Sequence, residues 1–454
     1  MMVINMKSIR EINDYININK SKIDSKYRLK FHMMPPVGWM NDPNGLVYHN
    51  GKYHIFYQAN PFNSLPGTMY WGEFITNDLI TYDDMGIAIA PNIEHSSIFS
   101  GGAISDNGMV SAIYTVHYEH DGCKRESVYL SEAKDGINFT EYGCVFDNET
   151  LPSNISREDF RDPYPVKVND EYYVLIGAKD IIINKGLIVV LKGKTLRKLT
   201  YAFSLGPYYE LGDMGECPSY YHIDGKDVIL ASGCRVAEVN NNYKNENSSV
   251  FIVGNIDFVK EEFKLDFIKE IDKGDVFYAP QIINSHDKPI MIGWLEMWGK
   301  RYPTHELNHG WNGALSIPRV LSIKNNDIYQ YPIEIPNHYY KEFSKDAKSF
   351  DMTLEFNSGG ELIISSENGN VKIGLENQLY LDTHQANNLN GCIRKTNNSY
   401  TKTVVRVLVD TSSVEVFVDG GKEAISSRIF LDGSYELSTN DNVKVLNLKE
   451  IGVE

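Results

Sequence analysis

The stretch Asp42–Gln58, DPNGLVYHNGKYHIFYQ, has the pattern of a β-hairpin, because a short strand, a polar turn and a second apolar strand follow one another. Four later windows share this pattern: SGGAISDNGMVSAIYTV, DPYPVKVNDEYYVLIGA, CPSYYHIDGKDVILASG and APQIINSHDKPIMIGWL, which begin at Ser100, Asp162, Cys217 and Ala279. Four of the five windows have proline at the second position, and successive windows start 58, 62, 55 and 62 residues apart. Any long all-β chain contains hairpins, but the shared proline and the even spacing favour a repeat.

A repeat of about sixty residues that begins with a hairpin fits a four-stranded blade, so five repeats predict a five-bladed β-propeller. From about residue 340 the chain changes to alternating strands with Asp-Gly and Gly-Gly turns, which is typical of an antiparallel sandwich. We therefore predict an all-β protein with a propeller over 27–338 and a β-sandwich over 339–454. The N-terminal extension, 1–26, is expected to contain one short amphipathic helix.

The composition excludes several classes of partner. The 454 residues include 44 Lys and Arg against 60 Asp and Glu, and the net charge of −16 disfavours nucleic acid and anionic membrane surfaces. The chain has no apolar run of the kind that a secretion signal or a membrane span requires. Its five cysteines are widely spaced and lack a paired ligand motif. We expect a cytoplasmic protein with reduced thiols and no cofactor.

Three acidic residues stand at the heads of the repeats. Asp42 and Asp162 directly precede the proline of their windows, and Glu216 lies two residues before Pro218. An isolated Asp-Pro most often starts a turn. In a propeller, however, the first strand of each blade lines the central channel, so these three carboxylates are expected to converge. Because buried like charges repel one another, such a cluster persists mainly where a reaction needs it.

Glycoside cleavage is the reaction that these residue types suit. It needs one carboxylate at the anomeric carbon and a second, with raised pKa, that protonates the leaving oxygen. Asp42 and Glu216 are the candidates. Asp162 follows Arg161, so we expect Asp162 to stay ionised and to accept hydrogen bonds from sugar hydroxyls. The repeat heads and ends also carry aromatic residues that can stack on sugar rings, although each alone is more often a core residue: Trp39, Trp71, Phe99, Tyr278 and Trp294.

Other kinds of site have weaker support. The chain lacks an Asp-rich loop with EF-hand spacing. THELNH at 304–309 contains the HExxH spacing, but an all-β context lacks the helix that this zinc-binding motif requires. A serine hydrolase is disfavoured because no GxSxG turn follows a strand. We therefore predict no metal site.

The motifs WMNDPNG (39–45), FRDP (160–163) and ECP (216–218), in this order, resemble the family-32 glycoside hydrolases, which include invertases, sucrose-6-phosphate hydrolases, levanases and inulinases. The resemblance covers nearly the whole chain, from about Phe31 to the tail VLVDTSSVEVFVDGG. It implies a five-bladed propeller followed by a sandwich, and cleavage of terminal β-fructofuranosyl groups with retention. It also implies that Asp42 is the nucleophile, that Glu216 is the acid and base, and that Asp162 stabilises the transition state.

The resemblance further implies residues that contact the sugar. These are Asn41, Gln58, Trp71, Phe99, Ser100, Arg161 and Trp294, and the stacking argument adds Trp39. The chain departs from the family pattern at Glu73 and Gly102, which we expect beside the pocket, so the exact substrate preference does not carry over.

The sequence leaves the following functions open. The leading one is a retaining β-fructofuranosidase that hydrolyses sucrose, sucrose 6-phosphate or a short fructan. A fructosyltransferase uses the same carboxylates, and a non-catalytic fructan-binding protein is disfavoured because all three are present. Sequence alone assigns no Lys/Arg cluster to a phosphate, although Lys300 and Arg301 are candidates. The C-terminal domain has three alternative roles: stability, a homodimer contact or sugar binding.

Overall fold

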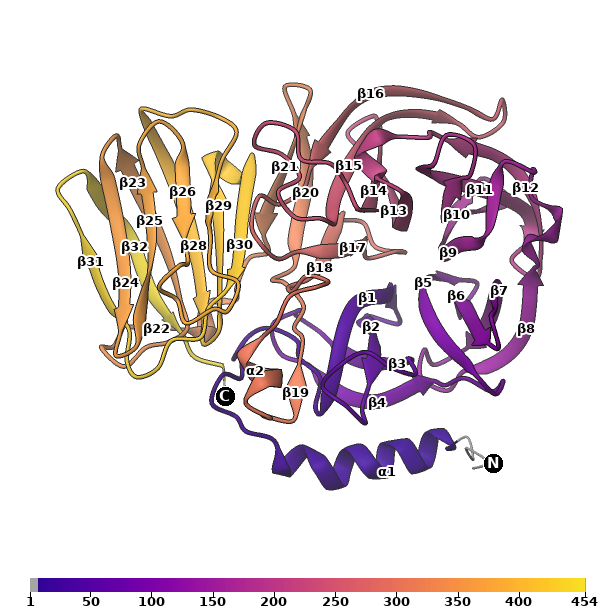
Figure 1. The fold of residues 1–454 in the computed structure, drawn as a ribbon, viewed down its shortest axis with the longest axis horizontal. Helices are drawn as coiled ribbons and strands as arrows, with labels where there is room; N and C mark the ends of the chain where they lie inside the picture. The colour runs from indigo at the N-terminus through magenta and orange to yellow at the C-terminus, as the bar shows by residue number, and fades with distance from the viewer. Residues whose placement is uncertain (1–6, 454) are drawn as a thin grey trace.

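The computed structural model describes residues 7–453 of the chain. Two bodies lie side by side in Figure 1: a ring of β-sheets around an axis, and a two-layered β-structure formed by the C-terminal part of the chain. The predicted propeller followed by a sandwich is confirmed, and the sheet topology gives five sheets in the ring. Residues 1–6 of the predicted extension lie outside the described part.

The ring contains five sheets of consecutive strands. The first has β1 (Gly38–His49), β2 (Lys52–Asn60), β3 (Tyr70–Thr76) and β4 (Asp83–Ile89), and the second has β5 (Ser96–Asp106), β6 (Met109–His120), β7 (Cys123–Ala133) and β8 (Thr140–Phe146). The third has β9 (Ile155–Val168), β10 (Glu171–Asp180), β11 (Lys185–Thr195) and β12 (Lys198–Leu205). The fourth has β13 (Met214–Ile223), β14 (Lys226–Cys234), β15 (Ser248–Asp257) and β16 (Glu262–Glu270). The fifth has β17 (Tyr278–Ile282), β18 (Ile290–Trp294), β20 (Arg319–Lys324) and β21 (Asp327–Pro332).

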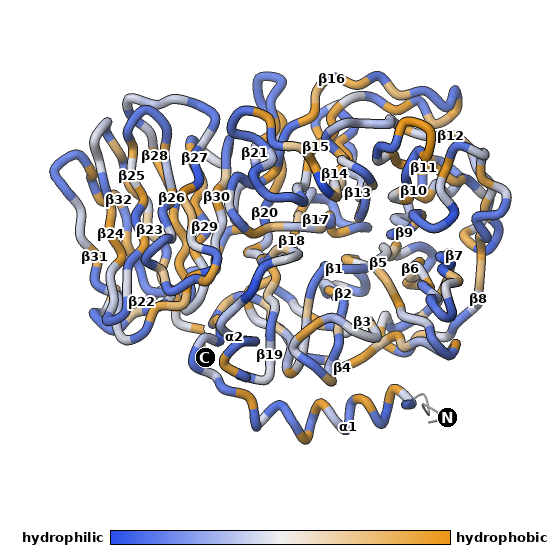
Figure 2. The backbone as a smooth tube through the Cα atoms, viewed as in Figure 1, coloured by the Kyte–Doolittle hydropathy of each residue, from blue (hydrophilic) through white to orange (hydrophobic). Residues whose placement is uncertain are grey.

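The five repeat windows are the first hairpins of these sheets, and their first strands form the inner wall of the ring. Each inner strand contacts the next one, and β17 contacts β1, so the ring closes. The segment after β18 contributes β19 (Trp311–Asn312), which pairs in parallel with β1. Apolar side chains fill the spaces between neighbouring sheets. Figure 2 shows the resulting pattern, with hydrophobic stretches along the strands and many hydrophilic loops.

The C-terminal sandwich consists of two antiparallel sheets. One has the order β22 (Tyr340–Lys341), β32 (Val443–Ile451), β23 (Phe350–Asn357), β28 (Lys402–Asp410), β29 (Ser413–Val418) and β30 (Glu423–Arg428). The other has the order β27 (Ile393–Lys395), β26 (Leu379–Asp382), β25 (Gly369–Leu375), β24 (Gly360–Ser366) and β31 (Glu436–Thr439). Alternate residues of both sheets point into one apolar core. The predicted boundary between 338 and 339 falls between β21 and β22 and stays a prediction.

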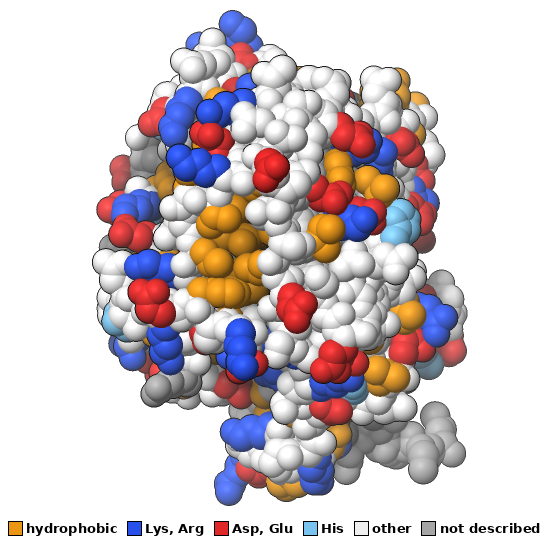
Figure 3. Space-filling view, turned by 90° about the vertical axis from the view of Figure 1, so that its left-hand side faces the viewer, with side chains coloured by type: hydrophobic (Ala, Val, Ile, Leu, Met, Phe, Trp, Pro, Cys, Tyr) orange, Lys and Arg blue, Asp and Glu red, His pale blue; other side chains and the backbone are white. Residues whose placement is uncertain are grey.

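The end of the sandwich that faces away from the ring carries a hydrophobic patch bordered by charged side chains (Figure 3). The exposed large hydrophobic residues of this domain include Val404, Val445 and Leu446.

The predicted N-terminal helix is α1 (Ile9–Asn19). Ser8 and Glu11 form a capping box at its start, which satisfies backbone donors of the first turn. The helix buries Ile12 and Ile16, which stabilises its docking by about 1.5–3 kcal/mol per side chain. Asn13 fixes the helix on β4, because its side chain exchanges hydrogen bonds with the backbone of Ile87 at 2.7 and 3.3 Å. A second helix, α2 (Pro303–Glu306), contains part of THELNH. Within residues 7–453, no helix is long and apolar enough to span a membrane.

A cluster of buried charges joins the two domains. His32 contacts Asp410 through Nδ1 and Glu415 through Nε2, each at 2.9 Å. Arg319 of β20 donates to Glu415 Oε2 at 2.5 Å and to Asp272 Oδ2 at 2.9 Å. Burial opposes a charge on His32, but hydrogen bonds to the two carboxylates outweigh it and raise the pKa of His32 to about 9. We call these five residues the interdomain cluster.

Candidate active site

Each of the five inner strands has a β-bulge at the same place in its repeat. The register shifts lie between Met40 and Pro43, Phe99 and Gly101, Arg161 and Tyr164, Glu216 and Ser219, and Tyr278 and Gln281. The first residue of every repeat window therefore lies in a bulge. Bulges re-aim side chains and leave a backbone N–H unpaired, which explains why proline, with no N–H to pair, is tolerated there.

The bulges bring the three predicted carboxylates to one pocket. Asp42 comes from β1, Asp162 from β9 and Glu216 from β13, and all three line a cavity of about 190 Å³. The bulge residue Asp162 has a positive φ of 67°, a left-handed conformation that Asp tolerates better than most residues. Three sheets thus contribute one carboxylate each, as the repeat predicted.

One carboxylate oxygen of Asp42 accepts a hydrogen bond, and the other does not. Its Oδ2 accepts a hydrogen bond from Ser100 Oγ at 2.8 Å and lies 3.5 Å from Cys217 Sγ. Within residues 7–453, its Oδ1 is buried without a hydrogen-bond partner. Burial raises the pKa of Asp42 to about 6. A fixed carboxylate with one unpaired oxygen is suited to attack an electrophilic carbon.

The carboxylate of Asp162 accepts a hydrogen bond from the backbone. Its Oδ2 accepts from Cys217 N at 2.9 Å, and its own N–H donates to Thr115 Oγ1 at 2.9 Å. Burial raises the pKa of Asp162 to about 7, although the charge of Arg161 opposes the rise. The expectation that Arg161 would keep Asp162 ionised is therefore wrong. Neighbouring residues of a strand point to opposite sides, and the Arg161 side chain reaches Glu216 instead.

Glu216 is held by a cation and a phenol. Arg161 donates to Glu216 Oε1 through Nε at 3.1 Å and through Nη2, and Tyr278 OH donates to Oε2 at 2.7 Å. Burial acts to raise the pKa of Glu216, but the charge of Arg161 and these hydrogen bonds hold it below its ordinary value. The predicted raised pKa of Glu216 is therefore wrong. On its other side, Arg161 Nη1 lies 3.4 Å from Oε1 of the fully buried Glu126. We call Asp42, Asp162, Glu216 and Arg161 the catalytic cluster.

The predicted sugar-contact residues divide into two groups. Five of them line the pocket: Asn41, Gln58, Phe99, Ser100 and Arg161. The three tryptophans Trp39, Trp71 and Trp294 are buried behind it and do not line it.

The buried tryptophans support the pocket wall. Trp71 Nε1 donates to the carbonyl of Phe99 at 3.0 Å, and Trp39 Nε1 donates to Asn41 Oδ1 at 2.7 Å. The rings of Trp39 and Trp294 pack at 5.6 Å between centroids. These large flat rings, which come from β1, β3 and β18, pack behind the pocket and orient residues that line it.

Glu73 and Gly102, which were expected beside the pocket, are not among the residues that line it. Glu73 is buried with His54, whose Nδ1 lies 2.8 Å from its Oε1. Gly102 lies where two sheets approach closely, because a Cβ there would lie 2.7 Å from Pro165 Cδ and 2.9 Å from Tyr164.

Sequence reasoning missed several residues of the pocket. Trp298, Met69 and Pro66 line it from connecting segments between strands. Trp298 packs on Trp294 at 4.9 Å between ring centroids. Tyr278 was expected as a stacking wall, whereas its hydroxyl donates to Glu216. No group of His, Cys, Asp and Glu within residues 7–453 has the arrangement of a metal site.

Comparisons with known proteins agree with this geometry. Residues 32–332 match the N-terminal domain of glycosyl hydrolases family 32, and residues 334–450 match its C-terminal domain. A sucrose-6-phosphate hydrolase of Escherichia coli is 32% identical over 431 residues, which cover 88% of each chain. A β-fructofuranosidase of Bombyx mori has a similar structure, with a TM-score of 0.87, 28% identity and 98% of each chain covered. A mutant of that silkworm enzyme has been solved in complex with sucrose.

Proposed function

The chain belongs to family 32 of the glycosyl hydrolases, and on this premise we propose that it is a retaining β-fructofuranosidase. Its proposed substrates are sucrose, sucrose 6-phosphate or short fructans, from which it releases the terminal fructosyl group. One observation carries the proposal: carboxylates from the bulges of three sheets line a single small pocket. A pocket of about 190 Å³ favours attack at the end of a sugar chain rather than within it.

The proposed reaction has two displacements at the anomeric carbon. Asp42 Oδ1 attacks this carbon while Glu216 donates a proton to the departing oxygen, and a fructosyl ester of Asp42 forms. Glu216 then accepts a proton from water, the water oxygen attacks the same carbon, and the ester bond to Asp42 breaks. Because each step inverts the carbon, the product keeps the β configuration.

The proton that Glu216 donates has a source within the catalytic cluster. Burial raises the pKa of Asp162 to about 7, so this carboxyl holds a proton below neutral pH. Sugar hydroxyls that donate to Asp162 favour its ionised form. We propose that substrate binding moves the proton to Glu216, since coupled carboxyls titrate as one unit. Asp162 is then ionised and stabilises the positive charge that develops on the sugar.

Fructosyl transfer is the main alternative, because a second sugar in place of water resolves the same ester. Oligosaccharides longer than the substrate, formed at high sucrose concentration, are its signature. A non-catalytic fructan-binding protein is a weaker alternative, since it has no need for an unpaired buried oxygen on Asp42.

A substrate panel tests the proposal. The purified protein is assayed for fructose release from sucrose, sucrose 6-phosphate, inulin and levan, and the substrates are ranked by kcat/KM. We expect turnover of at least one of them by the wild type and loss of that turnover in Asp42→Asn. Binding without cleavage of any fructoside would contradict the proposal and favour the binding-protein alternative.

The cytoplasmic location and the homodimer are also part of the proposal. Cell fractionation tests the first, and size-exclusion chromatography with light scattering tests the second.

A further inference from the structure

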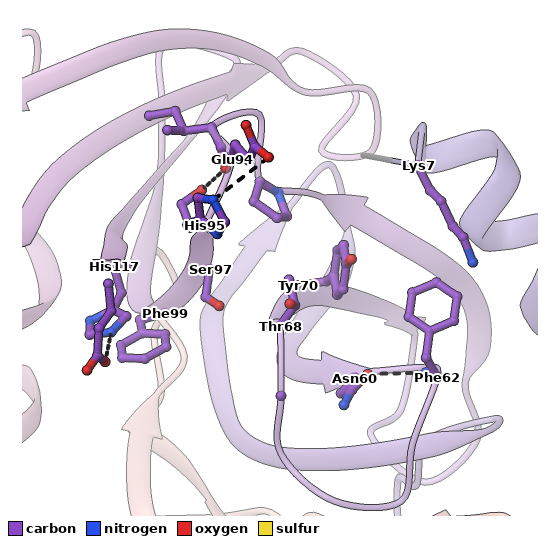
Figure 4. Close-up of a pocket in the computed structure, with 15 residues that line it drawn as sticks. Lys7, Asn60, Phe62, Thr68, Tyr70, Glu94, His95, Ser97, Phe99 and His117 are labelled. Carbon is purple, nitrogen blue, oxygen red and sulfur yellow. Dashed lines mark hydrogen bonds and ion pairs between the residues drawn. The ribbon is translucent and has the colours of Figure 1, made fainter. Parts of the chain in front are cut away.

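Phe99 and Trp298 line the catalytic pocket with aromatic side chains, but their support differs. Phe99 belongs to β5, and its ring stacks on His117 of β6 at 4.2 Å with 8° between the planes. Figure 4 shows these two rings side by side. Phe99 is thus supported by a neighbouring strand of its own sheet. Trp298 lies in the connection between β18 and α2, so contacts other than a β-ladder fix its position.

Trp298 belongs to residues 295–301, which we call the tryptophan segment, and the sandwich holds this segment near its start. Glu296 Oε1 accepts a hydrogen bond from Arg428 Nη1 of β30 at 2.9 Å, and both side chains are fully buried. The same oxygen accepts from the backbone N–H of Gly313 at 3.2 Å. Gly313 follows β19, the short strand that pairs with β1. Glu296 therefore joins the tryptophan segment and the edge of the first sheet to the sandwich.

The sandwich also holds the tryptophan segment at its end. Asn390 Nδ2 donates to the carbonyl of Arg301 at 2.6 Å, and Asn390 Oδ1 accepts from the Arg301 N–H at 3.4 Å. Asn388 Oδ1 accepts from the Asn390 N–H at 3.0 Å, and Asn388 Nδ2 donates to the carbonyl of Arg428 at 2.7 Å. The two anchors of the tryptophan segment therefore belong to one hydrogen-bonded unit of the sandwich.

The basic residues of the tryptophan segment, which the sequence offered for a phosphate, have other partners. Lys300 Nζ lies 3.2 Å from Asp275 Oδ2, and Arg301 forms two bonds of 2.7 Å with Glu306. Neither Lys300 nor Arg301 lines the catalytic pocket. The tryptophan segment thus contributes an aromatic wall rather than a cation to this pocket.

Between its two anchors, the tryptophan segment packs on the ring of sheets through Trp298. The centroid of this side chain lies 4.9 Å from that of Trp294 and 6.0 Å from that of Trp39. Trp39 in turn holds Asn41, which lines the pocket beside the proposed nucleophile Asp42. Pockets bury most of a small ligand against such walls, so a shift of Trp298 changes the surface that the substrate contacts.

We propose that Glu296 is a positioning residue, through which the sandwich fixes Trp298 in the wall of the catalytic pocket. The C-terminal domain then sets how tightly the substrate binds, a role that differs from the three that the sequence left open. The kinetic test of this inference rests on the proposed function. Because other residues hold the three carboxylates, loss of the wall should raise KM more than it lowers kcat.

The kinetic test removes the cation that holds Glu296. On the best substrate of the panel, Arg428→Met should raise KM by about fivefold or more and change kcat by less than about threefold. Trp298→Ala should also raise KM, and Arg428→Met added to Trp298→Ala should cause no further rise, because both substitutions disturb the same wall. If the two effects multiply, Arg428 does not act through Trp298, and the proposal is overturned.

Arg319→Met is the matched control. Arg319 is also a fully buried arginine at the domain boundary, but its carboxylate partners are Glu415 and Asp272. Its loss should lower stability and leave KM within about twofold of the wild type. Equal rises of KM in Arg319→Met and Arg428→Met would mean that a loosened domain boundary is responsible, and would overturn the proposal.

A double variant covers the case in which Arg428→Met does not fold. Glu296→Met combined with Arg428→Met leaves neither charge buried without its partner, and paired replacements of this kind are often neutral for stability. The double variant still lacks the anchor, so its KM should also rise by about fivefold or more. A KM within about twofold of the wild type would overturn the proposal.

Tryptophan fluorescence tests the inference without turnover. Trp298 is partly exposed. The other four tryptophans of the chain are buried: Trp39, Trp71, Trp294 and Trp311. Quenching by acrylamide should therefore act mainly on Trp298, and Trp298→Phe measures the remainder.

The fluorescence result separates failure of this inference from failure of the proposed function. Arg428→Met should increase the quenching constant of Trp298, because the segment is no longer anchored, and Arg319→Met should leave it unchanged. An unchanged constant in Arg428→Met would overturn the inference whether or not a fructoside is cleaved. Failure of the proposed function would instead leave the quenching result intact and abolish only the turnover.

Discussion

The protein contains two clusters of ionisable side chains with little exposure to solvent, and the clusters differ in how many of their carboxylates contact a cation. In the interdomain cluster every carboxylate contacts a cation, and the pKa values of Asp410 and Glu415 lie below their ordinary range despite burial. In the catalytic cluster Arg161 is paired with Glu216, and burial raises the pKa values of Asp42 and Asp162. Burial acts to raise the carboxyl pKa in both clusters, so the cation partners decide the direction of the shift.

The comparison separates a structural use of buried charge from a chemical one. Where each charge has a partner, removal of one partner leaves the other charge buried and unpaired, which destabilises the fold. Where carboxylates lack a cation partner, the fold bears a cost, and the protons held there are available for transfer. Substitutions in the catalytic cluster should therefore lower activity with little loss of stability. Substitutions in the interdomain cluster should lower stability with little loss of activity.

The largest expected effect is on turnover in the catalytic cluster. Asp42→Asn removes the nucleophile and Glu216→Gln removes the proton donor, so each should lower kcat by about 10³-fold or more. Initial rates on the best substrate of the panel measure this. The melting temperature should not fall by more than about 2 °C in Asp42→Asn, and a variant that keeps near wild-type turnover would refute its assigned role.

The second effect is on stability in the interdomain cluster. Arg319→Met leaves Glu415 and Asp272 buried without this cation, so the free energy of unfolding should fall by about 3–5 kcal/mol. Urea unfolding measures the loss, and kcat per folded molecule should stay within twofold. The control is Arg301→Met, which breaks an exposed pair with Glu306 and should cost less than about 1 kcal/mol. Equal losses in the two variants would show that the interdomain cluster has no special stabilising role.

The third effect is a gain in the free energy of unfolding, whereas the second is a loss. Because folding raises the pKa of Asp162 from 3.8 to about 7, the associated stability is fully present below pH 3.8 and lost as the pH rises through about 7. Asp162→Asn removes this loss, so it should raise the free energy of unfolding at pH 8 by on the order of 1–3 kcal/mol while abolishing turnover. Unfolding curves at pH 5 and pH 8 provide the check. A variant less stable than the wild type at pH 8 would contradict a raised pKa.

The smallest effect concerns the residue behind Arg161. Glu126→Gln removes a negative charge beside the guanidinium, which lowers the pKa values of nearby carboxyls. The alkaline limb of the kcat/KM profile should therefore move to lower pH by less than about one unit. Glu132→Gln, on the same strand but paired with Arg197, should leave the profile unchanged. A shift to higher pH in Glu126→Gln would reverse the assigned sign.

The repeat made the architecture and the three carboxylates predictable. Asp42 and Asp162 stand first in their windows and Glu216 stands one residue before its window, so propeller geometry alone brings them together. The partner of Arg161 was not predictable, because sequence spacing does not show which carboxylate of another strand a side chain reaches. The tryptophans were misplaced because an aromatic residue on any strand of a sheet packs equally well behind the pocket wall as on it. Trp298 was missed because it lies in a connection whose path depends on tertiary packing.

The stereochemistry of transfer to methanol tests the central claim most directly. If Asp42 forms a covalent fructosyl ester that an alcohol resolves, NMR of the reaction in dilute methanol should show methyl β-fructofuranoside as the transfer product. Formation of the α-anomer would mean a single displacement and would contradict the roles of Asp42 and Glu216.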